Sequence, residues 1–116
     1  MANEVAWAEV TGKDGEKLKS FYSDLFGWQV QQVPGGMPYW THTPEGGVGA
    51  GIGASQSGNG QVTFYVGVDD PQAALEKAEQ LGGKTVVPVT EMEMVTFAQF
   101  ADPEGNVVGI VKNQQS

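Results

Sequence analysis

The same order of patterned segments occurs twice in this chain, and this internal repeat limits the fold more than any other feature of the sequence. In each copy an alternating segment precedes a helical one that starts just after an Asp, and these two residues, Asp14 and Asp70, lie 70 − 14 = 56 positions apart. The same shift places Gly27 on Gly83, so a glycine follows the helical segment in both copies. The agreement of element order, more than the few identities, indicates two copies of one module.

Module one, about residues 4–54, has the pattern of a βαβββ unit. Residues 4–11 alternate as in a strand, and residues 14–26 carry apolar side chains at the spacing of a helix that packs one face on the core. Three more strands are predicted at 28–33, 37–43 and 47–54. The apolar stripe expected to face the core consists of Leu18, Phe21, Tyr22, Leu25 and Phe26.

Module two, about residues 61–113, follows a small polar linker at 55–60 and repeats the pattern. A strand is predicted at 61–68, a helix at 71–81 and strands at 84–89, 95–100 and 106–112, with Pro88 at an edge or bulge. The predicted fold is α+β: two βαβββ modules in one 116-residue domain, whose paired curved sheets form a cup.

Composition excludes several classes of function. With 14 acidic and 6 basic residues the net charge is −8, which opposes binding to nucleic acid or to an anionic membrane. The chain has no cysteine and one histidine, so it holds no disulfide, no thiolate site and no paired-histidine metal centre built from one chain. It also shows no signal peptide and no run of about 18 apolar residues. We therefore expect a cytoplasmic protein.

Three segments carry a resemblance to a known family. The sequences FYSDLFGW (21–28), VGVDDPQAALEKAEQLGG (66–83) and FADPEGNVVGI (100–110) resemble the vicinal-oxygen-chelate superfamily over nearly the whole chain. The resemblance implies the glyoxalase/bleomycin resistance/dihydroxybiphenyl dioxygenase fold and a homodimer, swapped or unswapped. The glycine-rich stretch GGVGAGI (46–52) resembles that of the small, metal-free branch.

The metal ligands of the superfamily's metal-dependent members are missing from the matching positions. Those members place a His or Gln seven residues before each helix-starting Asp, and a Glu near the end of each module. Here the matching residues are Trp7, Thr63, Gly53 and Gly109. A divalent ion needs several converging donors, so no metal and no cofactor are expected, and metal-dependent glyoxalase or dioxygenase activity is disfavoured. A metal held through Glu9 and the partner subunit's His42 stays open.

Six residues are candidates for contact with a ligand. If Trp7 faces the cup, Glu9 does so too, because alternate residues of a strand share a face. Their repeat counterparts are Thr63 and Tyr65, aromatic rings can stack on a planar ligand, and Phe97 lies in a soft apolar segment that can form a lip over the pocket. The candidate set is Trp7, Glu9, Tyr39, Thr63, Tyr65 and Phe97.

Three functions remain open on the sequence. The first is a metal-free protein that binds a small metabolite or antibiotic in the cup. The second is a metal-independent lyase or isomerase in which Glu9 is a general acid or base and Tyr65 or Thr63 donates a hydrogen bond. The third is a protein-interaction module whose cup is filled by its own aromatic side chains. Core packing and a strand-end carboxylate explain the same residues without any function.

Overall fold

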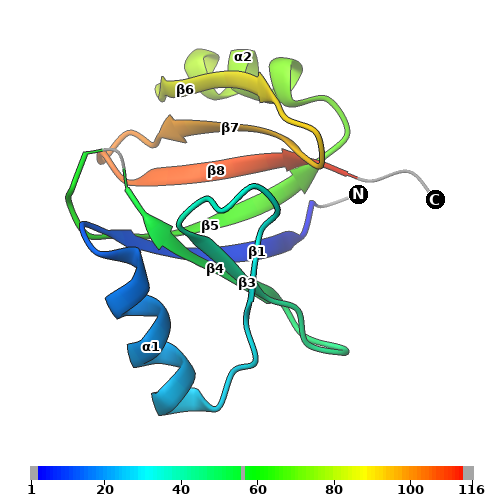
Figure 1. Ribbon diagram of the computed structural model, residues 1–116. Coiled ribbons are helices and arrows are strands. Elements are labelled where there is room, and N and C mark those ends of the chain that lie inside the picture. The colour runs from blue at the N-terminus through cyan, green and yellow to red at the C-terminus, as the bar shows by residue number, and fades with distance from the viewer. Residues whose placement is uncertain (1–2, 56, 114–116) are drawn as a thin grey trace. The chain divides into compact units, whose positions relative to one another are not determined.

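The computed structural model describes residues 3–55 and 57–113 (Figure 1). It divides into two compact units: Trp7–Val62, and the residues before Trp7 together with the chain from Thr63 onward. Each unit holds one helix and one four-stranded arrangement, in the predicted element order. The α+β class with two βαβββ modules is therefore confirmed.

Module one contains a helix and four strands. Its elements are β1 (Val5–Gly12), α1 (Gly15–Phe26), β2 (Gln31–Gln32), β3 (Tyr39–His42) and β4 (Gly49–Ala54). The strands lie in the order β2-β3-β4-β1, with β1 parallel to β4 and the other pairs antiparallel. The predicted strand at 28–33 is reduced to two residues. The strand order places the glycine-rich β4 between β3 and β1.

Module two repeats this arrangement. Its elements are β5 (Gln61–Val68), α2 (Pro71–Gln80), β6 (Lys84–Glu91), β7 (Thr96–Ala101) and β8 (Val107–Lys112). The order is β5-β8-β7-β6, with β5 parallel to β8. As predicted, Pro88 lies on an edge strand, β6, and a register shift between Val87 and Thr90 spans it. The core joins helix and sheet through Val68, Leu75, Ala98 and Ile110.

Both helices begin as the repeated Asp predicts. The Asp14 carboxylate accepts a hydrogen bond from the backbone N–H of Lys17 at 3.0 Å, and Asp70 accepts one from Ala73 at 3.1 Å. Each bond satisfies one of the backbone donors that a helix start leaves unpaired. Gly27, with φ +70°, ends α1 in the left-handed conformation that glycine adopts without strain.

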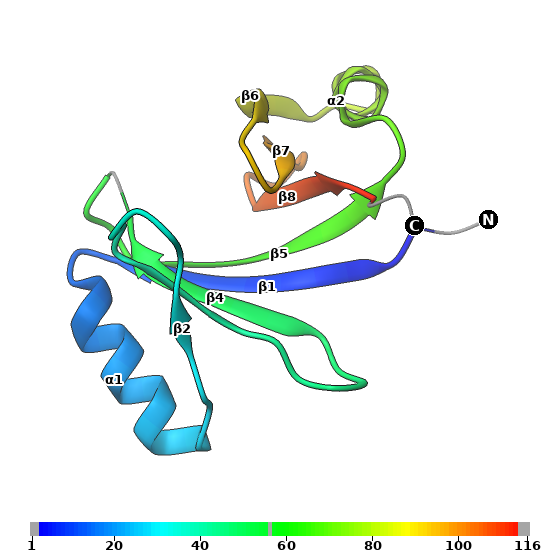
Figure 2. The same cartoon turned by 45° about the vertical axis from the view of Figure 1, so that its right-hand side comes forward.

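The expected core-facing stripe of α1 is wrong for three of its five members. Phe21, Leu25 and Phe26 expose 57%, 58% and 56% of their surface. The helix starts against the sheet, where a side chain on Gly15 would come within 2.9 Å of the Gly53 backbone, and then runs away from it (Figure 2). The apolar spacing predicted the helix correctly, but only the first turns of the helix pack against the sheet. In α2, Leu81 was likewise expected inward and is 71% exposed.

No helix among the described residues is long and apolar enough to cross a membrane.

Candidate functional site

Module one brings three of the predicted residues into one hydrogen-bonded chain. The Trp7 indole Nε1–H donates to the Tyr39 hydroxyl at 3.2 Å, and that hydroxyl donates to Glu9 Oε2 at 2.8 Å. Trp7 and Glu9 come from one face of β1, as predicted, and Tyr39 reaches them from β3. All three side chains are partly exposed. The result is a carboxylate held beside two aromatic rings.

Three glycines of β4 make room for these rings. A Cβ added at Gly49 would lie 2.9 Å from Trp7 Cε3, and one at Gly53 would lie 2.6 Å from Tyr39 Cδ1. A Cβ at Gly51 would collide with the Tyr39 hydroxyl and lie 2.9 Å from Trp7 Nε1. Both rings therefore rest directly on the backbone of β4, which only glycine allows. The structure thus gives the glycine run of β4 a steric reason.

Module two holds its own aromatic group. The Tyr65 ring lies over Gly109, the residue paired with it on β8, and packs edge-to-face on Phe97 with ring centroids 6.4 Å apart. Gln99 Nε2 donates to the Tyr65 hydroxyl at 2.8 Å. Sequence reasoning missed Gln99, although alternation along the predicted strand at 95–100 puts it on the same face as Phe97. This group is neutral where module one carries a carboxylate.

Thr63 is not placed to donate a hydrogen bond to a ligand. It is 4% exposed, and its hydroxyl donates to the backbone carbonyl of Val107 at 2.8 Å. A threonine hydroxyl has one proton to donate, so this bond to β8 uses it. Of the two donors considered for the proton-transfer hypothesis, Thr63 already donates to Val107, while the Tyr65 hydroxyl accepts from Gln99.

The strand registers change one of the four positions that match the superfamily's metal ligands. Glu9 pairs with Gly51 and Tyr65 pairs with Gly109, offsets of 51 − 9 = 42 and 109 − 65 = 44 residues. The counterpart of Gly109 in module one is therefore Gly51, not Gly53, because β8 lies two residues further along the chain than a uniform shift predicts. Both are glycines, so this donor set does not fit a divalent ion. Among the described residues no three His, Cys, Asp or Glu side chains form a group suited to a metal.

His42 and Trp40 lie away from the Trp7 group. The His42 imidazole stacks on Trp28 with centroids 5.0 Å apart and planes at 8°, and its Nδ1 lies 3.3 Å from the Gln29 carbonyl. Trp40 follows Tyr39 on β3 and so faces the opposite side of the sheet, where Lys19 Nζ lies 5.5 Å from its ring centre. Trp40 is 8% exposed and therefore acts as a core residue under α1.

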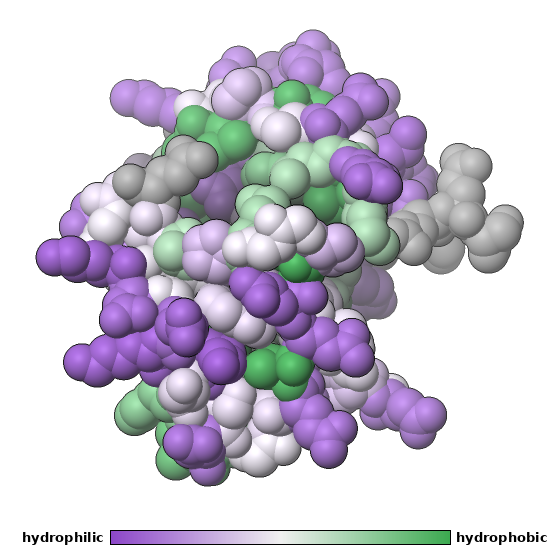
Figure 3. Space-filling view, viewed as in Figure 1, coloured by the Kyte–Doolittle hydropathy of each residue, from purple (hydrophilic) through white to green (hydrophobic). Residues whose placement is uncertain are grey.

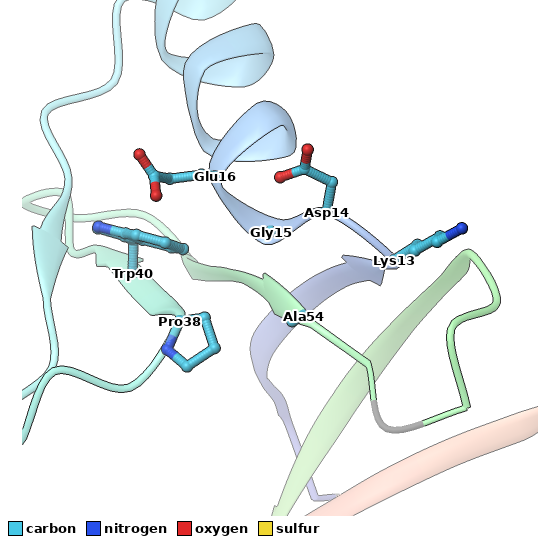
Figure 4. Close-up of a pocket in the computed structure, with 7 residues that line it drawn as sticks. All are labelled: Lys13, Asp14, Gly15, Glu16, Pro38, Trp40 and Ala54. Atoms are coloured by element: carbon cyan, nitrogen blue, oxygen red, sulfur yellow. The ribbon is translucent and has the colours of Figure 1, made fainter.

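A separate hollow of about 470 Å³ opens beside the start of α1 (Figure 4). The Glu16 carboxylate and the Trp40 ring lie on one side of it, and Asp14 and Lys13 on the other. None of the six predicted ligand contacts lines it. Because Asp14 caps the helix and Trp40 belongs to the core, the structure gives these residues a role in folding.

Comparisons with known proteins agree with this architecture. Residues 7–111 match the family model of the glyoxalase-like domain. The chain is 29% identical over 117 residues to a glyoxylase-like domain-containing protein of Didymella fabae, covering 92% of this chain and 91% of that protein. It is 29% identical over 119 residues to the anthracycline biosynthesis protein DnrV of Streptomyces peucetius, covering 86% of this chain. The match covers 43% of DnrV, so the chain spans less than half the length of that relative.

A solved structure extends the comparison to the fold. A glyoxalase/bleomycin resistance protein/dioxygenase superfamily member from Vibrio splendidus is similar with a TM-score of 0.62 at 20% identity, over 97% of this chain and all (100%) of that one. At this identity the likeness concerns the fold alone. The family model, in contrast, spans most of the sequence. The chain belongs to the glyoxalase-like family of the vicinal-oxygen-chelate superfamily.

Proposed function

We propose that this protein binds a small, planar or amphipathic metabolite or antibiotic without a metal ion, in the cup expected of its fold. The observation that carries the proposal is the Trp7–Tyr39–Glu9 group. Two aromatic rings rest on the glycine strand β4 with a carboxylate fixed between β1 and β3. Flat aromatic faces favour planar ligands, and a carboxylate beside them favours a cationic group such as an amine.

Two further observations support this ligand class. The net charge of −8 attracts cationic small molecules towards the protein. The family relative DnrV is named for anthracycline biosynthesis, and an anthracycline is a planar, polycyclic compound. An anthracycline is therefore a suitable first probe, beside a panel of other metabolites and antibiotics.

The metal-free part of the proposal rests on the donor set. Trp7 and Thr63 stand where the metal-dependent members of the superfamily carry a His or Gln, and the two paired positions on β4 and β8 are Gly51 and Gly109. The Thr63 hydroxyl donates its hydrogen bond to the backbone of β8. No step of the proposed function passes through a metal.

A titration calorimetry experiment tests the binding proposal. We expect the purified protein to bind a planar cationic probe in the presence of a chelator, and Glu9→Gln to weaken that binding because it removes the charge and keeps the shape. Glu45→Gln, at an exposed carboxylate of the same module, is the matched control and should bind as the natural protein does. Equal binding by both variants would contradict the assignment of the site to Glu9.

A second candidate is a metal-independent lyase or isomerase with Glu9 as general acid or base. The bond from Tyr39 fixes the carboxylate at a defined position, which proton transfer requires. In that case Glu9 takes a proton from carbon beside a substrate carbonyl and returns it to another atom. A natural chain with turnover that Glu9→Gln abolishes while binding is kept favours this reading. A natural chain without turnover, whose ligand binding Glu9→Gln weakens, favours the binding protein. The interaction-module reading predicts no ligand in either form.

The predicted homodimer and cytoplasmic location stay proposals of the same account.

A further inference from the structure

We propose that the exposed face of α1 binds the same face of a second copy of this chain, with the two helices antiparallel about a twofold axis. The face, called here the α1 face, consists of Lys17, Phe21, Asp24 and Leu25. It is independent of the proposed ligand site, which lies on β1, β3 and β4.

The α1 face is apolar at its centre and unusually open. Phe21 and Leu25 are 57% and 58% exposed, and both lie on the stripe that the sequence pattern marks for burial. Positions 17, 21, 24 and 25 are spaced i, i+4, i+7 and i+8, so they share one side of the helix. Apolar surface appears over α1 at the lower left of the space-filling view (Figure 3). Covering two such side chains removes apolar area from water and favours association.

The neutral charge of α1 allows the α1 face of a second copy to bind there without repulsion. The chain carries −8, and two copies would repel each other over most of their surface. Within α1, however, Glu16 and Asp24 are balanced by Lys17 and Lys19, so this helix is neutral. A membrane with anionic lipids would meet the acidic remainder of the molecule and is disfavoured.

The order of the charges matches an antiparallel pair. The point on α1 halfway between Lys17 and Asp24 lies between residues 20 and 21, beside Phe21. A twofold axis through that point sets Lys17 opposite the partner subunit's Asp24, and by symmetry forms the same pair again. Phe21 then packs beside its counterpart at the centre. Such a face is complementary to itself, as an isologous interface must be, and the charges fix its register.

Sedimentation velocity over a concentration series tests the apolar centre. We expect the natural chain to form a dimer and Phe21→Asp to raise the dissociation constant at least about 30-fold, the loss typical of an interface hot spot. Leu81→Asp is the matched control, because it adds the same charge at a 71% exposed leucine of α2, and it should dimerise as the natural chain does. A natural chain that stays monomeric at every concentration, or a Phe21→Asp dimer as tight as the natural one, would overturn the proposal.

A charge exchange tests the antiparallel register. Lys17→Asp or Asp24→Lys alone should weaken the dimer, and the double variant should restore it to within a few-fold. Both changes suit the helix macrodipole, with the acid near the N-terminus and the base near the C-terminus, so lost dimerisation would not reflect a weakened helix. Circular dichroism checks this directly. Failure of the double variant to recover would refute the proposed pairing. Ligand titration on each variant reports separately on the proposed function.

Discussion

The Tyr39 hydroxyl donates to the Glu9 carboxylate at 2.8 Å, although 30 residues separate them in sequence and a whole strand lies between theirs in the sheet. The two side chains meet above β4 because Gly51, between them, has no side chain. An alanine there would collide with the Tyr39 hydroxyl. The site of module one therefore requires glycine at position 51 as well as the three side chains that form it.

Removing the Tyr39 hydroxyl should destabilise module one. Tyr39→Phe loses the bonds to Glu9 and Trp7, and a hydrogen bond to a charged group contributes about 1.5–3 kcal/mol when buried; for these partly exposed residues we expect a loss of about 1–2 kcal/mol. Urea denaturation measures it. Tyr22→Phe, at a half-buried tyrosine of α1, is the control and should change the free energy of unfolding by less than about 0.5 kcal/mol. Equal effects would show that the hydroxyl chain contributes nothing.

Adding a side chain at Gly51 on β4 should lower both the stability of the protein and its affinity for the ligand. Gly51→Ala forces Tyr39 or Trp7 off β4, and overpacking of this kind costs about 1–3 kcal/mol. Gly60→Ala is the control, because an added Cβ there meets nothing within 4 Å; it should leave stability unchanged or raise it by up to about 1 kcal/mol. Thermal unfolding and ligand titration read out both effects. Normal ligand binding by Gly51→Ala would place the ligand elsewhere.

Removing the Ser23 hydroxyl should stabilise the protein. Its Oγ is buried with no hydrogen-bond partner in the described part of the chain, and a buried unsatisfied hydroxyl is costly. Alanine also has the higher helix propensity. We expect Ser23→Ala to raise the free energy of unfolding by about 0.5–1 kcal/mol, measured by urea denaturation. A clear loss of stability would show that the hydroxyl has a partner in solution.

The turn at Asp102 should give a pH-dependent contribution. The Asn106 side-chain amide, with backbone N–H groups of Asn106, Glu104 and Gly105, holds the pKa of Asp102 below its ordinary value of 3.8. A lowered carboxyl pKa stabilises the folded state above the unfolded pKa, and this contribution is lost as pH falls through the folded pKa. Asp102→Asn should therefore lower the urea midpoint at pH 7 and have a smaller effect at pH 3. An effect that grows towards pH 3 would reverse the assigned sign.

The repeat, the helices and most strands followed from local patterns in the sequence. Asp14 and Asp70 act within one turn of their helices, so their role as caps is visible in the sequence. In contrast, the two-residue difference between the offsets of β4 and β8 depends on turn geometry, and it moved the expected counterpart of Gly109 from Gly53 to Gly51.

The side-chain partners were harder to predict. The pairing of Trp7 and Glu9 followed from alternation on one strand, whereas Tyr39 and Gln99 reached their partners only through the sheet register. The apolar spacing of α1 could not show that the second half of the helix leaves the sheet, because spacing specifies a face and not what covers it. The exposure of Phe21 and Leu25 was therefore visible only in the structure.

The most direct test of metal-free ligand binding is native mass spectrometry of the purified protein with metal analysis, before and after incubation with an anthracycline and a metabolite panel. The account predicts protein without stoichiometric metal that retains one small molecule per chain, and loses it on Glu9→Gln. A stoichiometric divalent ion in the purified protein, required for ligand retention, would contradict it.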